Sequence, residues 1–281
     1  MLKPTASVLS KCSLFFAVIS LAACGGSSNG GSGSGPEGTG DPEPVATGVK
    51  PGVYSTTIAG DATPQAFTLV SSSGEYGLFA NARAGTFGTL ALGNGEPITG
   101  NGANVFFDEI WQSVDGTLDV NVINSEEFTA AFTAAGSDPG AGSDVTASRI
   151  NELSNRGLTM QALSDTYFLS DTDRDTGVVS QTASVTIDAD GTVTGSESVP
   201  GSDPDKGCII SGTVSIPDTA VNILEGNLSF TNCATIDSAS SQQRNGDYRV
   251  IGYLLRFDAG AKRLVFAGTN NKVMSLFSGD N

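Results

Sequence analysis

The chain has 281 residues, of which 14 are Lys or Arg and 30 are Asp or Glu, so its formal net charge at pH 7 is −16. Such an acidic chain disfavours nucleic acid as a partner, because binding to phosphates needs clustered Lys and Arg. The chain has no histidine, which excludes Ser-His-Asp and Cys-His catalysis and the usual His-ligated zinc, copper and iron sites.

The N-terminus has the features of an export signal. Lys3 and Lys11 supply positive charge, and residues 13–22 form an apolar run that is too short to span a bilayer as a helix. The run ends in Leu21-Ala22-Ala23-Cys24, which resembles the lipobox of bacterial lipoproteins. The resemblance implies a signal peptide over 1–23, cleavage before Cys24, and acylation of that cysteine with fatty acids such as palmitate. The alternative is an ordinary secretory signal with a chance cysteine.

Residues 24–49 are expected to hold the folded part of the chain to a membrane. Gly25 stands where many lipoproteins retained at the inner membrane of Gram-negative bacteria have Asp, so the resemblance implies the outer membrane. Whether the protein faces the periplasm or the cell surface stays open. The segment is rich in Gly, Ser and Pro and has little apolar surface to bury, which predicts a disordered tether.

Residues 50–134 are predicted to form a first β domain. Leu118, Val120 and Val122 alternate with other residues, and this period of two is typical of half-buried strands. Pairs such as Ser73-Gly74 and Asp115-Gly116 predict the tight turns that separate short strands.

Residues 135–163 are predicted to be a linker. Its first part is loop-like, and a short helix is expected over 146–157, with Thr146 as a possible cap and Gly157 at its end.

Residues 164–281 are predicted to form a second β domain, because alternation returns in runs such as Ile251, Tyr253 and Leu255. The fold class is therefore all-β, with two small antiparallel domains that are sandwich-like or barrel-like. Each half opens with a tyrosine, Tyr54 or Tyr167, and continues with a similar strand and turn. Duplication is one interpretation of this pattern, and shared composition is the other.

Two cysteines are left to pair if Cys24 is acylated and Cys12 is removed with the signal. Export places Cys208 and Cys233 in an oxidising compartment, which predicts a disulfide. A redox-catalytic role is disfavoured because no Cys-x-x-Cys motif is present.

The C-terminal half also resembles a group of uncharacterised bacterial lipoproteins over about residues 160–268. The resemblance rests on the hairpin Val185–Gly195, the cysteine strand Gly207–Val214 and the later strand Leu228–Cys233. It implies architecture and location but no activity.

One acidic loop is a candidate metal site. Asp171, Asp173 and Asp175 alternate along it, and converging carboxylates suit a hard cation such as Ca²⁺. The loop departs from the EF-hand pattern, which needs Gly and Glu where Thr176 and Thr182 stand. A solvated hairpin loop is the alternative.

Other carboxylates and one aromatic residue are candidate catalytic or ligand-binding groups. The pairs Asp108-Glu109 and Glu126-Glu127 cannot share a site in regular strands, since neighbouring side chains point to opposite faces. Carboxylates from different strands can still come together. Trp111, the one tryptophan, is expected in the core rather than on a ligand platform.

These observations predict an envelope lipoprotein that is held to the membrane by its lipid and binds an unknown protein or glycan without catalysis. The first alternative is a carboxylate-dependent envelope hydrolase acting on glycans, and the second is a calcium-stabilised surface module. A deep groove with clustered carboxylates and exposed aromatics would favour the enzyme, whereas a shallow surface would favour binding. No cofactor is expected apart from possible Ca²⁺.

Overall fold

A computed structural model describes residues 48–59, 66–81, 83–92, 98–136, 143–172, 179–198, 207–236 and 239–281. The chain divides into Met1–Glu43 and a compact unit, Pro44–Asn281. The predicted signal peptide, Cys24 and nearly all of the predicted tether lie outside the described residues.

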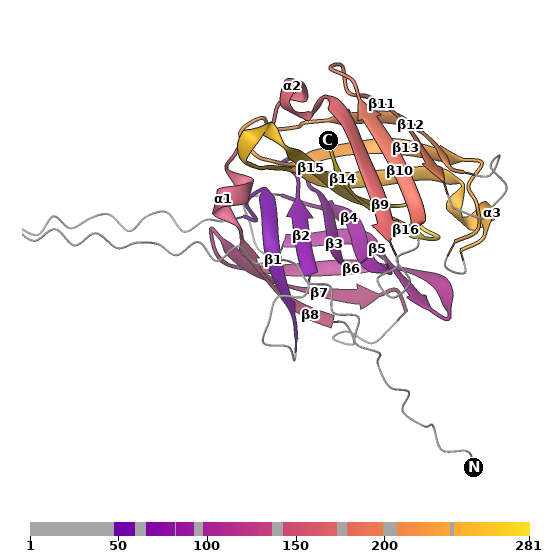
Figure 1. Cartoon of the computed structure of the whole chain (residues 1–281). Helices are drawn as coiled ribbons and strands as arrows, with labels where there is room; N and C mark the ends of the chain where they lie inside the picture. The colour runs from indigo at the N-terminus through magenta and orange to yellow at the C-terminus, as the bar shows by residue number, and fades with distance from the viewer. Residues whose placement is uncertain are drawn as a thin grey trace, which may run out of the picture. The chain divides into compact units, whose positions relative to one another are not determined.

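The first eight strands form a closed antiparallel barrel, called barrel 1, in which each strand pairs with its neighbours in chain order (Figure 1). The strands are β1 (Gly52–Ile58), β2 (Ala66–Val70), β3 (Glu75–Asn81), β4 (Ala84–Leu90), β5 (Ile98–Asp108), β6 (Ile110–Asn124), β7 (Glu127–Ala134) and β8 (Ser143–Arg149).

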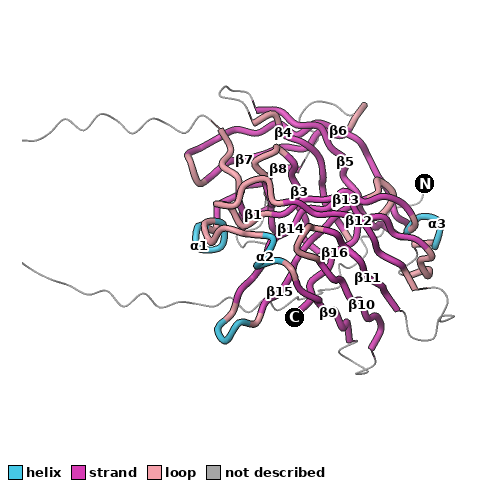
Figure 2. The backbone as a smooth tube through the Cα atoms, turned by 90° about the horizontal axis from the view of Figure 1, so that it is seen from above, coloured by secondary structure: helices cyan, strands magenta, loops and turns pink. Residues whose placement is uncertain are grey.

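The second eight strands form barrel 2, which is also closed and antiparallel, with β16 returning to β9 (Figure 2). The strands are β9 (Asp165–Thr172), β10 (Val179–Ile187), β11 (Thr192–Ser198), β12 (Ile209–Ser215), β13 (Leu224–Thr231), β14 (Gly246–Arg256), β15 (Lys262–Thr269) and β16 (Met274–Asp280). The short helices are α1 (Asn151–Ser154), α2 (Met160–Leu163), α3 (Ser241–Arg244) and the 3-10 turn η2 (Asp258–Gly260). The predicted all-β class is confirmed, and both sheets are barrels.

The prediction of a helix over 146–157 is wrong for its first part. Val145 and Ala147 are buried in barrel 1, while Thr146 between them faces outward, so this segment has the period of a strand. It forms β8, which pairs with both β7 and β1 and closes the barrel. Between residues 146 and 163, helix is confined to α1 and α2, because long-range pairing of β8 outweighs local helical preference.

The predicted turn at Asp115-Gly116 is also wrong, because both residues lie inside β6. A Cβ atom on Gly116 would lie 2.3 Å from the carbonyl oxygen of Thr133 and 2.6 Å from the ring of Phe132. The glycine therefore allows close approach of a neighbouring strand, which is a second use of glycine in sheets.

Each barrel encloses its own apolar core. Tyr54, Leu118, Val120 and Phe128 belong to the core of barrel 1, while the intervening Asp119 is exposed. The core of barrel 2 is larger and includes the disulfide cysteines and the stacked rings of Phe266 and Phe277. The alternation predicted from the sequence thus separates the inside of each barrel from its outside.

In the first strand of each barrel, a buried tyrosine donates a hydrogen bond to the chain just before that strand. The O–H of Tyr54 in β1 donates to the carbonyl of Lys50, four residues earlier. In β9, the O–H of Tyr167 donates to the carbonyl of Leu163 over 2.7 Å. These are the two tyrosines that open the predicted halves, and they occupy the first strand of each barrel.

A second feature is repeated between the barrels. Gly74 follows β2 and Gly191 follows β10, and both have positive φ, 93° and 88°. The carbonyl of Gly74 accepts from the N–H of Leu90 over 2.7 Å, and the carbonyl of Gly191 accepts from the N–H of Val214 over 2.9 Å. Corresponding turns therefore contact corresponding strands, β4 and β12, which supports duplication over chance composition.

The two barrels pack through an apolar interface. Outward-facing side chains of barrel 1 join those of barrel 2 in one buried cluster: Val53, Leu69, Phe79, Phe87, Ala103 and Val105 with Ile223, Ile251, Tyr253, Val265, Ala267 and Met274. The rings of Phe67 and Tyr253 lie 6.5 Å apart between centroids. The contacting strands are buried on both faces, so the two barrels form one compact unit.

Gly77→Val tests this interface. A Cβ atom at Gly77 would lie 2.7 Å from Cγ2 of Ile251 and 3.2 Å from the ring of Phe87, so a larger side chain overpacks the interface. We expect the free energy of unfolding, measured by urea denaturation, to fall by about 1–3 kcal/mol. The control Ala135→Val lies at an exposed position and is expected to change it little; equal losses in both variants would contradict the interface.

Candidate functional site

The predicted disulfide is confirmed. Cys208 and Cys233 are joined with an S–S distance of 2.04 Å, and both are buried in the core of barrel 2. The bond connects the start of β12 to the segment after β13, so it fixes the end of a hairpin. Its burial favours a structural role, because reactive disulfides are strained or exposed.

The calcium hypothesis falls largely outside the described residues. Asp171 lies in β9, whereas Asp173 and Asp175 are outside the residues that the structure describes. Within the described ranges, there is no group of three or more Cys, Asp or Glu side chains placed to hold a metal ion. Calcium binding by the acidic loop stays a prediction.

The adjacent carboxylate pairs do not form sites. Glu126 contacts Lys50, whereas the carboxylate of Glu127 accepts from the side chain of Asn124 over 3.4 Å. In the other pair, Glu109 occupies the turn between β5 and β6 with φ of 59°. The carboxylates of Glu126 and Glu127 therefore take different side-chain partners.

Trp111 lies at the start of β6 and is half-buried. Its ring lies 5.7 Å from that of Phe107 between centroids, and it packs against the core of barrel 2 and the interface between the barrels. These contacts agree with the packing role expected from the sequence.

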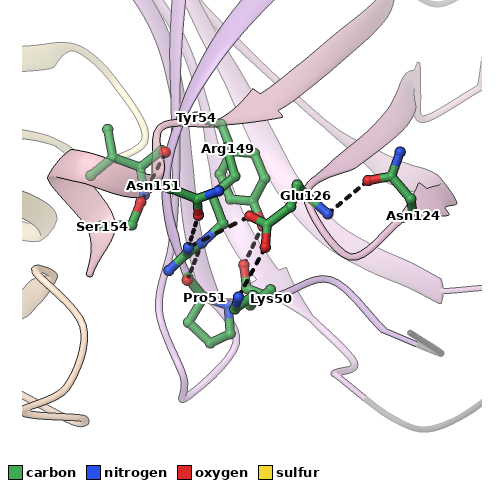
Figure 3. Close-up of polar contacts among 9 residues, drawn as sticks. Lys50, Pro51, Tyr54, Asn124, Glu126, Arg149, Asn151 and Ser154 are labelled. Atoms are coloured by element: carbon green, nitrogen blue, oxygen red, sulfur yellow. Dashed lines mark hydrogen bonds and ion pairs between the residues drawn. The ribbon is translucent and has the colours of Figure 1, made fainter. Parts of the chain in front are cut away.

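A charged cluster lies around the segment that precedes β1 (Figure 3). The side chain of Arg149, at the end of β8, is 1% exposed. Its Nε donates to the carbonyl of Pro51 over 3.0 Å, and its Nη1 donates to the side-chain oxygen of Asn151. Arg149 also lies 3.6 Å from a carboxylate oxygen of Glu126, whose other oxygen accepts from Lys50 over 3.0 Å.

The cluster stabilises the barrel end rather than offering a free site. Its guanidinium, ammonium and carboxylate groups take one another as partners, and they tie the segment before β1 to β8 and to the turn before β7. Partial burial raises the pKa of Glu126, but hydrogen bonding and the charges of Lys50 and Arg149 outweigh this and leave the pKa below its usual value.

Acid is expected to weaken the cluster. Because the pKa of Glu126 is lower in the folded state, its ionised carboxylate stabilises the fold at pH values above the usual glutamate pKa. This stabilisation is lost as the pH falls through the lowered pKa of the folded state. Lys50→Met removes one cause of this shift, so the difference in melting temperature between parent and variant should shrink as the pH falls below about 4. A difference that stays constant from pH 7 to pH 3 would contradict this role of Lys50.

A buried ion pair lies in barrel 2. Arg244 Nη2 is 2.5 Å from a carboxylate oxygen of Glu197, and their side chains are 12% and 6% exposed. Arg244 Nη1 donates to the carbonyl of Ala234 over 2.5 Å, and the N–H of Glu197 donates to the carbonyl of Cys208 over 2.8 Å. The pair and the disulfide therefore support the same end of the barrel.

The outer face of barrel 1 has an open groove of about 680 Å³ across β6, β7, β8 and β1. Two cross-strand rows line it. One row runs through Asn121, Thr129, Thr146 and Thr57, and the other through Asp119, Ala131, Asp144 and Ala59. We call this surface the threonine groove.

A second groove of about 620 Å³ continues the same face across β4 to β7. Thr89, Asn101, Thr117 and Thr133 form one row in it, and Arg249 of barrel 2 borders it. The two grooves share strands β6 and β7, so they form a continuous polar surface.

The groove residues suit recognition better than catalysis. Asp119 and Asp144 are exposed, so neither lies in the desolvated surroundings that are typical of a catalytic acid. The residues that line the threonine groove include no aromatic side chain. Hydroxyl, amide and carboxylate groups can instead donate and accept hydrogen bonds with a polar ligand.

Comparison with known proteins identifies no relative: no family model, curated protein or solved structure matches the chain. None of the helices among the described residues has the length and hydropathy needed to cross a membrane.

Proposed function

We propose that the protein is an outer-membrane lipoprotein that binds a polar envelope or extracellular ligand and catalyses no reaction. The lipobox at Cys24 supplies the anchor, and the Gly-, Ser- and Pro-rich segment after it supplies the tether. The folded unit Pro44–Asn281 carries the ligand-binding surface.

The observation that carries the binding proposal is the threonine groove. It is open rather than enclosed, and small polar side chains form its floor in regular rows. Such a surface supports many hydrogen bonds to an extended ligand but does not exclude water as an active site does. Glycans and polar protein segments are the ligands that fit this chemistry.

Ala131→Arg is the sharpest test of the groove, because Ala131 lies between Asp119 and Asp144 on adjacent strands. An arginine there would fill the groove and engage both carboxylates. We expect the purified full chain to sediment with isolated peptidoglycan sacculi, and the variant to lose this property. Ser215→Arg, at an exposed position of barrel 2, is the matched control. If both variants still sediment with sacculi, the threonine groove is not the binding surface.

The anchor is tested separately by Cys24→Ser. Cells grown with labelled palmitate should label the parent chain but not the variant, and the variant should leave the membrane fraction. A labelled Cys24→Ser chain, or a parent chain without label, would contradict the lipoprotein proposal.

A hydrolase acting on glycans is the second candidate, favoured by one observation. Asp119 and Asp144 face the same groove on strands separated only by β7, which places their backbones about 9.5 Å apart. Side chains on backbones at this spacing can place their carboxyl groups within the separation found in inverting glycosidases, about 6.5–9.5 Å. Release of reducing ends from sacculi by the parent, lost in Asp144→Asn, would support the enzyme over the binding protein.

A further inference from the structure

Barrel 2 has an outer surface of different chemistry, which we call the neutral face. It spans the five adjacent strands β9 to β13 in two cross-strand rows. The first row is Thr166, Thr186, Thr194, Ser211 and Ser229, and the second is Phe168, Ser184, Ser196, Ile209 and Thr231. None of these ten side chains is charged, although the chain carries 30 acidic residues.

Two apolar side chains stand out from the neutral face. Phe168 is 61% exposed and Ile209 is 54% exposed. They belong to the same row, with Ser184 and Ser196 between them, so they are about 14 Å apart along the direction in which strands are spaced. The face therefore presents two apolar contact points separated by hydroxyl groups.

The hydroxyl groups of the neutral face keep hydrogen-bonding capacity. Thr166 and Thr186 contact each other through their Oγ1 atoms over 2.9 Å, and the Oγ atoms of Ser184 and Ser196 lie 3.4 Å apart. Each hydroxyl has one donor and two acceptor positions, so these contacts do not exhaust them. The surface can both donate to and accept from an incoming ligand.

We propose that the neutral face binds a neutral polysaccharide chain, with a sugar ring against Phe168. Sugar rings combine hydroxyl edges with faces of C–H groups, and the C–H groups meet the electron-rich face of an aromatic ring. The serine and threonine hydroxyls match the sugar hydroxyls. The ten side chains of the face carry no charge, and Asp280, the register partner of Phe168, is paired with Arg263. The face therefore favours uncharged polymers over uronates and amino sugars.

The composition of the face favours a glycan over a protein partner. Protein interfaces are enriched in aromatic residues, Met and Arg and are depleted in Ser, whereas eight of the ten side chains here are Ser or Thr. The open face predicts weak binding at each site, strengthened where a long polymer engages several protein molecules. This inference is independent of the threonine groove.

Electrophoresis of the full chain through native gels containing a polysaccharide tests the proposal. The probes are hydroxyethyl cellulose and dextran as neutral polymers, with polygalacturonate as the anionic comparison. We expect at least one neutral polymer, and not polygalacturonate, to slow the parent chain. Phe168→Ser should weaken this binding about tenfold, and Ser196→Asp, which places a charge in the neutral face, should abolish it.

The controls separate the neutral face from other surfaces. Ile123→Ser removes an exposed apolar side chain of barrel 1, and Ser215→Asp adds a charge to barrel 2 outside the neutral face; both should bind like the parent. Ala131→Arg should also bind neutral polymer normally, even if it abolishes binding to sacculi. The proposal is overturned if neither neutral polymer slows the parent, or if Phe168→Ser and Ile123→Ser lose binding equally.

Discussion

Glu197→Ala is expected to lower the free energy of unfolding by about 3–5 kcal/mol, because it leaves the guanidinium of Arg244 buried without its carboxylate. The side chains of Glu197 and Arg244 are 6% and 12% exposed, so water cannot replace the lost partner fully. Arg244 would still donate to the carbonyl of Ala234, which satisfies only part of its hydrogen-bonding capacity. Urea denaturation at neutral pH measures the loss.

Glu127→Ala is the control for this substitution. Glu127 contacts the side chain of Asn124 at the surface, and such exposed polar contacts contribute little to stability. We expect its unfolding midpoint to match that of the parent closely. Similar midpoints for Glu197→Ala and Glu127→Ala would show that the buried ion pair is not the cause of any loss.

Replacing Cys208 and Cys233 together by Ala is expected to destabilise the chain by about 3–4 kcal/mol, the value for a closed loop of this length in the chain-entropy model. The two cysteines are 25 residues apart, and their removal also leaves a space in the core of barrel 2. Reduction of the parent should lower its melting temperature, while a reducing agent should have no effect on the double variant. An equal effect of the reducing agent on both would contradict this account.

The disulfide and the ion pair are expected to act together. The N–H of Glu197 donates to the carbonyl of Cys208, and the N–H of Cys233 donates to the side-chain oxygen of Asn245, next to Arg244. Because neighbouring groups in one network do not contribute additively, the triple variant should lose less stability than the two separate losses combined. Additive losses would show that the groups act independently.

Local patterns predicted the strands better than their closure into barrels. Alternation at residues such as Leu118 and Val120 reflects a property of each strand, so it is visible in a single sequence. Closure depends on pairing between β8 and β1, whose residues are almost a hundred positions apart, and no local pattern encodes that pairing. The segment 143–149 was misassigned for this reason.

Of the candidate sites, the disulfide could be predicted from the sequence, whereas the sites built by cross-strand contacts could not. The Cys208–Cys233 bond could be predicted because assigning Cys12 to the signal peptide and Cys24 to acylation leaves only these two cysteines to pair. The contact between Glu126 and Arg149 depends on the register of β7 and β8, and both residues are of types that are usually exposed. The threonine groove and the neutral face likewise depend on registers, which align side chains from strands distant in the sequence.

The apolar interface between the barrels bears on how the chain is made. A chain is synthesised from its N-terminus, so barrel 1 can fold before barrel 2 exists. During that interval Val53, Leu69 and Phe79, which are buried in the interface of the finished protein, would face water. Large exposed apolar patches promote aggregation, so a nascent chain that stalls after Arg149 would need a chaperone to cover this surface. In the complete chain, barrel 2 covers the same surface once it has folded.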